Sequence, residues 1–355
     1  MSKVVSILAL LAVIGVAYAG DEKPTVAQAF KNIRVLAVPE AGRPVDTTVA
    51  EELRRELAPQ AEIRVIAPGG PLEAWPGVFR IAVADEKLAS GPPSQVPGRT
   101  AADKDWMYLR LGENGAGELT ASSAHLMYAL FRLLRDDWAD SPASDFQTGR
   151  LVRPRFSRLE GGDNYLANPK RVAAGYDAEA SVRELARLGF SHVPVNALAK
   201  DMPAEQGPPG EIYYRFYYFS PDIDQFVETP LNAGAYSPEY LEANLALLKE
   251  NARLAVKYGL TPGLNISSPR SVPEAVLEKY PYLRGARVDH PFRSYRPRFT
   301  LTLSHPLVRW HYAELMRRLM REAPELGYIY LWTNDSGSGF EYTASLYAGR
   351  NGGAY

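Results

Sequence analysis

Strand-like and helix-like stretches alternate through the second half of this chain, and that alternation limits its fold more than any other feature. Short runs rich in β-branched and aromatic residues are separated by longer stretches with apolar residues at helical spacing. Strands that alternate with helices pair in parallel, with right-handed crossovers. The expected strands are 156–159, 190–195, 260–266 and 327–332, and the expected helices are 177–188, 238–258 and 307–321.

The natural closure of such a sheet is a (β/α)8 TIM barrel, which needs about 250 residues. Residues 155–355 supply only four strand–helix steps, and the sequence stops about twenty residues after the last expected strand. We therefore predict an α/β protein with a partial TIM-barrel domain at 155–355, of which only about the first half is present, as in a fragment of a longer protein. The alternative is a small open α/β domain.

A smaller α/β unit is expected before the barrel, at residues 20–145. Its pattern is a mixture of short strands and two amphipathic helices, the first of them capped by Asp46. The expected strands are 33–38, 63–66, 78–83 and 105–111, and the expected helices are 47–57 and 125–135. The polar, turn-rich passage 141–154 marks the boundary between the two domains. A chain of 355 residues is long enough for two domains of ordinary size.

Composition excludes several classes of function. The 40 basic and 41 acidic residues nearly cancel, and no basic block stands out, so a nucleic-acid partner is disfavoured. The chain has no cysteine, which rules out disulfides, thiolate nucleophiles and cysteine-ligated zinc. The histidines show no metal-binding spacing, and no glycine-rich phosphate loop or GxSxG elbow is found. We expect neither a cofactor nor a metal, and the sequence says nothing of oligomeric state.

The first residues have the pattern of a signal peptide. Lys3 is followed by an apolar run from Val4 to Val16, and Ala17-Tyr18-Ala19 provides small residues for cleavage. A run of about 13 residues is shorter than the roughly 20 needed to span a bilayer, although a retained N-terminal membrane helix is the alternative. With 1–19 as a signal peptide, the mature protein begins near Gly20, has no membrane span and is periplasmic or secreted.

Polar side chains follow each expected barrel strand. In a TIM barrel the active site lies at the carboxyl ends of the strands, so these side chains are the candidate substrate-binding residues. They can hydrogen-bond hydroxyl groups, as a carbohydrate requires. The candidates are Asp163, Asn164, Asn196, Asn265, Arg270, Trp332 and Asn334.

Two further stretches favour a sugar. Residues 212–219 are rich in tyrosine and phenylalanine, whose ring faces pack against the C–H faces of pyranose rings, although a buried aromatic strand is an equal alternative. Arg293, Arg296 and Arg298 are closely spaced in an expected loop, and a guanidinium can bind the carboxylate of a uronic acid. A solvated surface is the alternative for these arginines.

Glycoside hydrolysis normally needs two carboxyl groups that flank the scissile bond, one of them protonated. Asp335 and Glu341 are the candidate catalytic acids, because they follow the last expected strand in a glycine-rich loop. Trp332 beside them would raise the pKa of a neighbouring carboxyl group by desolvation. The second carboxylate of the pair is not identified by the sequence.

Several motifs together resemble the α-glucuronidase type of glycoside hydrolase (family 67). The passages that carry the resemblance are Thr302–Pro306, Pro324–Tyr328, Asn334–Gly337, Tyr258–Leu260 with Asn265, and Leu119–Ser123 with Leu126–Leu130. The last of these is similar to the end of a small N-terminal domain that this family shares with β-hexosaminidases. The resemblance implies a barrel enzyme acting on glycans, with Asp335 at the position of the family's aspartate.

One departure from the family affects the mechanism. The family's catalytic glutamate directly follows Asp-Ser, but Gly337 stands at that position here, and Glu341 is the nearest acid that could replace it. The expected function is hydrolysis of glycosidic bonds in a polysaccharide or oligosaccharide, with uronate-bearing glycans as candidates. A non-catalytic glycan-binding protein on a degenerated barrel is the main alternative, and an enzyme of another class on the same barrel is a weaker one.

Overall fold

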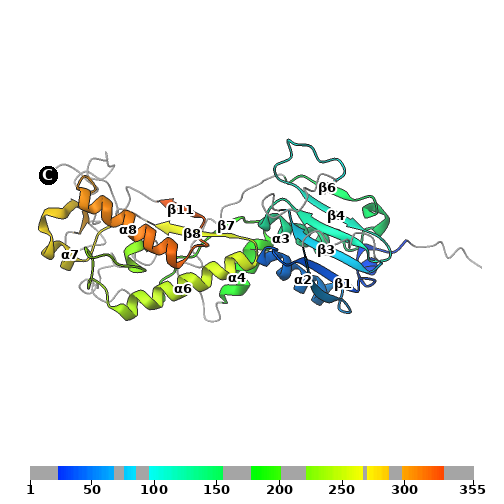
Figure 1. The fold of residues 1–355 in the computed structure, drawn as a ribbon, viewed down its shortest axis with the longest axis horizontal. Helices are drawn as coiled ribbons and strands as arrows, with labels where there is room; N and C mark the ends of the chain where they lie inside the picture. Colours follow the sequence, from blue (N-terminus) through cyan, green and yellow to red (C-terminus); the bar gives the residue numbers. More distant parts are fainter. Residues whose placement is uncertain are drawn as a thin grey trace, which may run out of the picture.

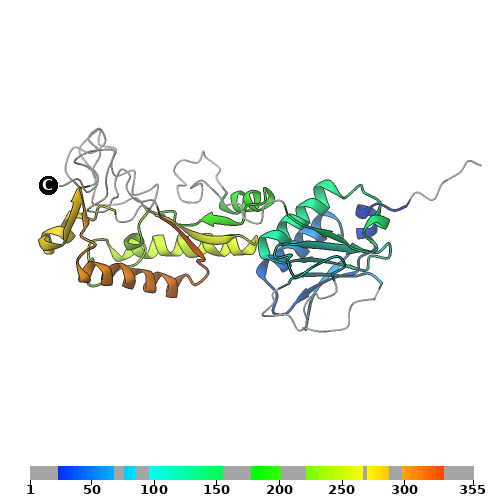
Figure 2. The same cartoon turned by 90° about the horizontal axis from the view of Figure 1, so that it is seen from above.

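The computed structural model describes residues 23–67, 76–84, 96–154, 177–200, 221–266, 270–287 and 298–331. These residues form two lobes placed side by side along the long axis of the molecule (Figures 1 and 2). The first lobe contains a six-stranded mixed sheet, and the second contains a three-stranded parallel sheet. The fold is α/β with a partial barrel, as the alternation of strands and helices predicted.

The sheet of the first lobe has the strand order β2-β1-β3-β5-β4-β6. Its strands are β1 (Val35–Pro39), β2 (Glu62–Ile66), β3 (Val78–Val83), β4 (Met107–Leu111), β5 (Gly117–Ala121) and β6 (Arg150–Val152). The first four strands in this order pair in parallel, whereas β4 is antiparallel to both β5 and β6. Strand β5 was not predicted, and β6 lies within the passage in which we predicted the domain boundary.

Two helices cover the face of this sheet that is directed toward the second lobe. They are α2 (Pro44–Glu56) and α3 (Ala124–Arg132), and α3 continues into a π-helical segment, η1 (Leu133–Asp137). The prediction that Asp46 is the N-cap of the first helix was wrong. Pro44 takes the first helical position, and Asp46 is the third residue of the helix, where its carboxylate accepts hydrogen bonds from the backbone N–H groups of Arg43 and Val83 at 2.9 Å each. The short helices α1 (Val26–Phe30) and η2 (Ala143–Phe146) complete this lobe.

From residue 177 onward the second lobe contains the predicted helices and strands in the predicted order, and the predicted strand 156–159 lies outside the described residues. Its described elements are α4 (Ala178–Arg187), β7 (His192–Pro194), η5 (Ile223–Gln225), α6 (Pro238–Lys257), β8 (Thr261–Ile266), α7 (Glu274–Lys279), η6 (Pro281–Leu283), β9 (Arg284–Arg287), β10 (Phe299–Leu301), α8 (Pro306–Glu322) and β11 (Tyr328–Leu331). The strand order is β11-β8-β7. Asp177 caps α4, and Gly189 adopts φ +88° just after it, both as predicted.

A small subdomain separates β8 from α8. It contains α7, η6 and the antiparallel pair β9 and β10, none of which was predicted. A separate apolar cluster that includes Leu277, Leu283, Leu301 and Val308 forms its core. In both views this subdomain lies at the end of the molecule opposite the first lobe (Figures 1 and 2).

The two lobes share one apolar core. Buried side chains of α2, α3, α4, α6 and both larger sheets belong to a single cluster. The hydroxyl of Thr48 in α2 donates to the carbonyl of Lys257 at 2.8 Å, satisfying an acceptor at the end of α6. Gly259 follows with φ +80°, and a Cβ there would lie 2.5 Å from the carbonyl oxygen of Ala124. The lobes are therefore packed against each other and not simply tethered.

A buried carboxylate adds a polar contact to this interface. Glu52 of α2 is 3% exposed and accepts a hydrogen bond from the Tyr128 hydroxyl at 2.8 Å. The guanidinium of Arg183, on α4 in the second lobe, lies 2.8 Å from the same carboxylate. The ring of Tyr128 also meets Tyr258 edge-on, with 5.5 Å between centroids. Residues of three helices and of both lobes thus meet at Glu52.

The predicted signal peptide, residues 1–19, lies outside the described residues. Within the ranges that the structure describes, no helix is both long and apolar enough to cross a bilayer.

Candidate functional site

The carboxyl ends of β7, β8 and β11 meet at one edge of the second sheet, directed away from the first lobe (Figure 1). Pro194, Gly263 and Tyr328 lie in register across the three strands. Two residues later, the predicted candidates Asn196 and Asn265 lie next to each other. Asn196 and Asn265 thus lie at the carboxyl edge of the strands, the edge at which barrel enzymes bind their substrates.

Asn196 is fully engaged within the protein. Its side-chain amide donates to the carbonyls of Asn265 at 2.8 Å and Pro221 at 3.2 Å, and its Oδ1 accepts from the N–H of Asn265 at 3.0 Å. The residue is 0% exposed. With both amide donors and its oxygen used in this way, the geometry favours a positioning role for Asn196, which joins β7 to β8 and holds the segment that begins at Pro221. Asn265 itself is half-buried.

A pair of buried acids follows Pro221 and was missed by the sequence analysis. Asp222 is 4% exposed and Asp224 is 8% exposed. Burial raises the pKa of Asp224, the charge of Asp222 raises it further, and the guanidinium of Arg270 opposes both. Arg270, a predicted substrate-binding residue that follows β8, is itself 2% exposed and lies close enough to Asp224 to act on its charge.

Hydrogen bonds fix this acidic segment. Asp222 caps the short helix η5, since its Oδ1 accepts from the N–H of Ile223 at 2.8 Å and its own N–H donates to Oε1 of Gln225 at 3.0 Å. The amide of Gln225 in turn donates to the hydroxyl of Tyr240 at 3.0 Å, and Tyr240 stacks on Tyr236 with 5.2 Å between ring centroids. The role of Asp222 in this geometry is structural, and Asp224 is the acid left to hold a proton.

The sequence signal for these acids was two aspartates two residues apart, separated by Ile223 and followed by the apolar pair Phe226 and Val227. They lie more than twenty residues after β7, however, whereas we predicted site residues mainly among those that directly follow each strand. Site residues that lie within a long connection between a strand and its helix are therefore missed.

The remaining predicted site residues lie outside the described residues. These are Asp163, Asn164, Trp332, Asn334, Asp335 and Glu341, as well as the aromatic stretch 212–219. Of the three closely spaced arginines, only Arg298 is described. It is 4% exposed, and burial lowers its pKa to about 10. For Arg298 the structure therefore contradicts a solvated surface, the alternative that we considered for all three arginines.

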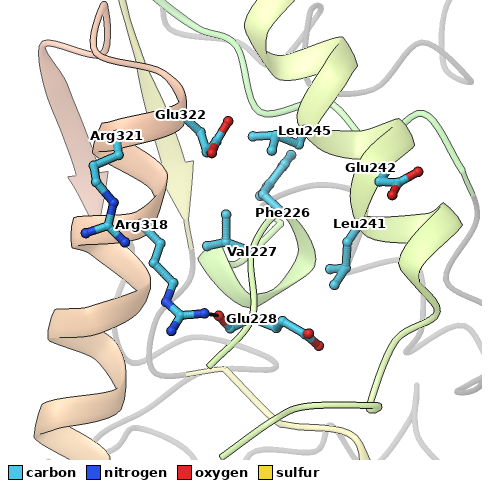
Figure 3. Close-up of a pocket in the computed structure, with 9 residues that line it drawn as sticks. All are labelled: Phe226, Val227, Glu228, Leu241, Glu242, Leu245, Arg318, Arg321 and Glu322. Atoms are coloured by element: carbon cyan, nitrogen blue, oxygen red, sulfur yellow. Dashed lines mark hydrogen bonds between the residues drawn. The ribbon is translucent and has the colours of Figure 1, made fainter. Parts of the chain in front are cut away.

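A surface cavity of about 340 Å³ lies between α6, α8 and the segment that follows η5 (Figure 3). Its apolar floor is formed by Phe226, Val227, Leu241 and Leu245, and its rim is charged. The guanidinium of Arg318 reaches across to donate to the carbonyl of Glu228 at 2.7 Å. This cavity belongs to the helical layer and contains none of the side chains predicted to bind substrate.

In the part of the chain that the structure describes, no group of three or more histidine or acidic side chains is arranged to hold a metal ion. At the described edge, the groups that could take part in chemistry include the carboxyl of Asp224, the guanidinium of Arg270 and the amide of Asn265. They can donate and accept hydrogen bonds, and the acid can hold a proton.

Comparison with solved structures finds a similar fold in a glycoside hydrolase. No family model and no curated protein matches the sequence. The structure superposes on a GH138 enzyme targeting pectin rhamnogalacturonan II with a TM-score of 0.51 and 10% identity, over 86% of this chain and 31% of that one. The chain thus spans about a third of the length of that enzyme.

Looser similarity extends to two other glycoside hydrolases. A family 89 enzyme from Clostridium perfringens gives a TM-score of 0.43 at 10% identity, over 84% of this chain and 32% of that one. A GH115 4-O-methyl-α-glucuronidase with specificity for decorated arabinogalactans gives 0.41 at 14% identity, over 91% of this chain and 37% of that one. The chain has a glycoside hydrolase-like fold, and the comparisons do not single out the family 67 type that the motifs resemble.

Proposed function

We propose that this protein is an exported glycoside hydrolase that cleaves glycosidic bonds in a polysaccharide or oligosaccharide, with uronate-bearing glycans among its candidate substrates. One observation supports this most strongly. In a glycoside hydrolase-like fold, Asn196, Asn265, Arg270 and Asp224 gather at the carboxyl edge of the parallel strands, where barrel enzymes bind substrate. Export is inferred from the pattern of residues 1–19.

The proposed mechanism uses two carboxyl groups. Asp335 or Glu341 acts as the general acid and gives its proton to the departing glycosidic oxygen, and a second carboxylate assists attack at the anomeric carbon. Trp332 provides an apolar wall that raises the pKa of the acid and stacks on a sugar ring. The side chains that bind sugar hydroxyls are Asp163, Asn164, Asn265 and Asn334, and Arg270 binds a carboxylate if the glycan carries one.

The experiment is an assay of reducing-sugar release on a panel of plant and algal polysaccharides. The proteins compared are the wild type, Asp335→Asn, Glu341→Gln and the double variant. Removing a general acid lowers turnover by about a hundredfold to ten-thousandfold. Asp140→Asn and Glu325→Gln are matched controls at exposed positions outside the site, and they are expected to keep wild-type rates. Unchanged turnover in the double variant would contradict the proposal.

The main alternative is a glycan-binding protein without catalysis, which is favoured by Gly337 at the position of the family's catalytic glutamate. Isothermal titration calorimetry with the same glycans separates the two functions. Heat of binding without any release of reducing ends would establish the alternative.

A further inference from the structure

The subdomain between β8 and α8 carries an exposed aromatic side chain that the proposed catalytic site does not use. Tyr282, in η6, is 62% exposed. Its ring lies edge-on to Tyr280, with 6.3 Å between centroids, and 5.8 Å from the ring of His305 at the start of α8. Three rings from two elements thus form one group, which we call the aromatic platform: Tyr280, Tyr282 and His305.

The platform is held rigidly. Tyr280 packs on the apolar core of the subdomain, and its backbone N–H and carbonyl bond to Val276 at 2.9 Å and Leu283 at 3.0 Å. The carbonyl of Leu283 also accepts from the N–H of Thr302 at 2.9 Å, which joins the turn to the end of β10. Because the backbone on both sides of Tyr282 is fixed in this way, only side-chain freedom is lost when the ring binds a ligand.

Polar groups lie beside the other two rings of the platform, Tyr280 and His305. The ammonium of Lys279 lies 5.1 Å from the Tyr280 ring centroid, and the hydroxyls of Thr302 and Ser304 lie 2.9 Å apart, just before His305. Nδ1 of His305 accepts from the N–H of Leu307 at 3.2 Å, so in the neutral ring the proton is on Nε2, which is a donor. A flat apolar face beside hydroxyl, ammonium and imidazole groups matches a pyranose, which has an apolar C–H face and a rim of hydroxyls.

The surroundings favour a sugar over a protein partner. Among the described residues 270–305, Tyr282 is the only large apolar side chain that is exposed. Stable protein interfaces bury on the order of 1,000 Å² or more with an apolar centre, whereas a single ring suits one sugar residue. The subdomain also follows the carboxyl end of β8 directly, so it lies at the end of the sheet where the candidate site lies (Figures 1 and 2).

We propose that the aromatic platform is a carbohydrate-binding subsite, which holds one sugar residue of an extended glycan whose scissile bond lies at the carboxyl edge of the sheet. The carbohydrate class of this ligand rests on the proposed function. The stacking ring is Tyr282, with Tyr280 and His305 fixing its position and Lys279, Thr302 and Ser304 available to the sugar hydroxyls.

Affinity electrophoresis tests this subsite. Gels contain one soluble polysaccharide each: pectic rhamnogalacturonan, arabinogalactan, glucuronoxylan or glycol chitin. The wild type is compared with Tyr282→Ala, Tyr282→Leu and Tyr282→Phe, each also made in the Asp335→Asn/Glu341→Gln background so that no polysaccharide is consumed. Tyr282 is exposed, so these variants are expected to fold, and circular dichroism verifies this.

At least one polysaccharide is expected to retard the wild type, and Tyr282→Ala is expected to bind it about tenfold more weakly. Tyr282→Phe keeps the ring and is expected to bind within about twofold of the wild type, whereas Tyr282→Leu is expected to be as weak as the alanine variant because it lacks a flat face. Equal binding by Tyr282→Ala, full binding by Tyr282→Leu, or no retardation of the wild type by any of the four polysaccharides overturns the proposal. Binding that depends on Tyr282 without release of reducing ends would overturn the proposed catalysis and leave the subsite standing.

Discussion

Replacing Glu52 by alanine tests whether the two lobes fold as one packed unit. The substitution removes the acceptor of the Tyr128 hydroxyl and the nearer of two carboxylates beside the Arg183 guanidinium, which keeps Glu56 at 3.6 Å. A hydrogen bond to a charged group contributes about 1.5–3 kcal/mol. The ion pair adds less than a fully buried pair would, because the Arg183 side chain is 27% exposed and therefore partly screened by solvent. We expect the free energy of unfolding to fall by about 3 kcal/mol in total.

The assay is urea unfolding followed by far-UV circular dichroism. Glu51→Ala is the matched control, since Glu51 is an exposed neighbour on the same helix, and its effect is expected to stay within about 0.5 kcal/mol. In a double-mutant cycle, Tyr128→Phe is expected to cost less in the Glu52→Ala background than in the wild type. If Glu52→Ala unfolds like the control, or if the two substitutions are additive, the interface does not depend on this contact.

Three further predictions concern the stability of the second lobe. Gly259→Ala is expected to lower the free energy of unfolding by about 3 kcal/mol or more, because it adds a steric clash to the strain of a positive φ. Gly234→Ala is the control: Gly234 has φ +80° but no neighbouring atom within 4 Å of the added Cβ, so the expected loss is only about 1 kcal/mol. Equal shifts in melting temperature for the two variants would contradict this. Burial lowers the pKa of His311 from 6.5 to about 4. As the pH falls from 6.5 to 4, the unfolded state therefore binds the proton before the folded state does, and the free energy of unfolding falls by about 3 kcal/mol. His311→Gln is expected to flatten this dependence in urea titrations between pH 7.5 and 4.5, and an unchanged slope would refute the assignment. Asn196→Ala removes both amide donors and is expected to lower the free energy of unfolding by about 2–3 kcal/mol in urea titrations at pH 7.5. A loss of less than about 0.5 kcal/mol would contradict the positioning role of Asn196.

The long periodic elements could be predicted from the sequence. Helix α6 begins after Ser237 and ends before Gly259, close to the predicted bounds, because the caps and the apolar spacing agree there. Strand β3 has the predicted bounds, 78–83. Short strands without an apolar run were missed. Residues 284–287 (Arg-Gly-Ala-Arg) pair only because the apolar core beneath them places them beside β10, which is information that no local pattern contains.

The candidate site was predicted only in part. That Asn196 and Asn265 meet follows from parallel pairing, which the alternation of strands and helices implies. The side chain of Asn196 forms hydrogen bonds to the backbone of Asn265, and this contact depends on the register of β7 and β8. Local sequence does not determine that register. Asp224 becomes a buried acid through the long connection after β7, and its environment depends on Arg270, which comes from a different strand.

The most direct test of the central claim is a crystal structure of the protein with an oligosaccharide bound in the Asp335→Asn/Glu341→Gln double variant. A sugar is expected at the carboxyl edge of β7, β8 and β11, within hydrogen-bonding distance of Asn265 and between the side chains at positions 335 and 341. A sugar bound only in the cavity between α6 and α8, or residues 335 and 341 directed away from that edge, would contradict it.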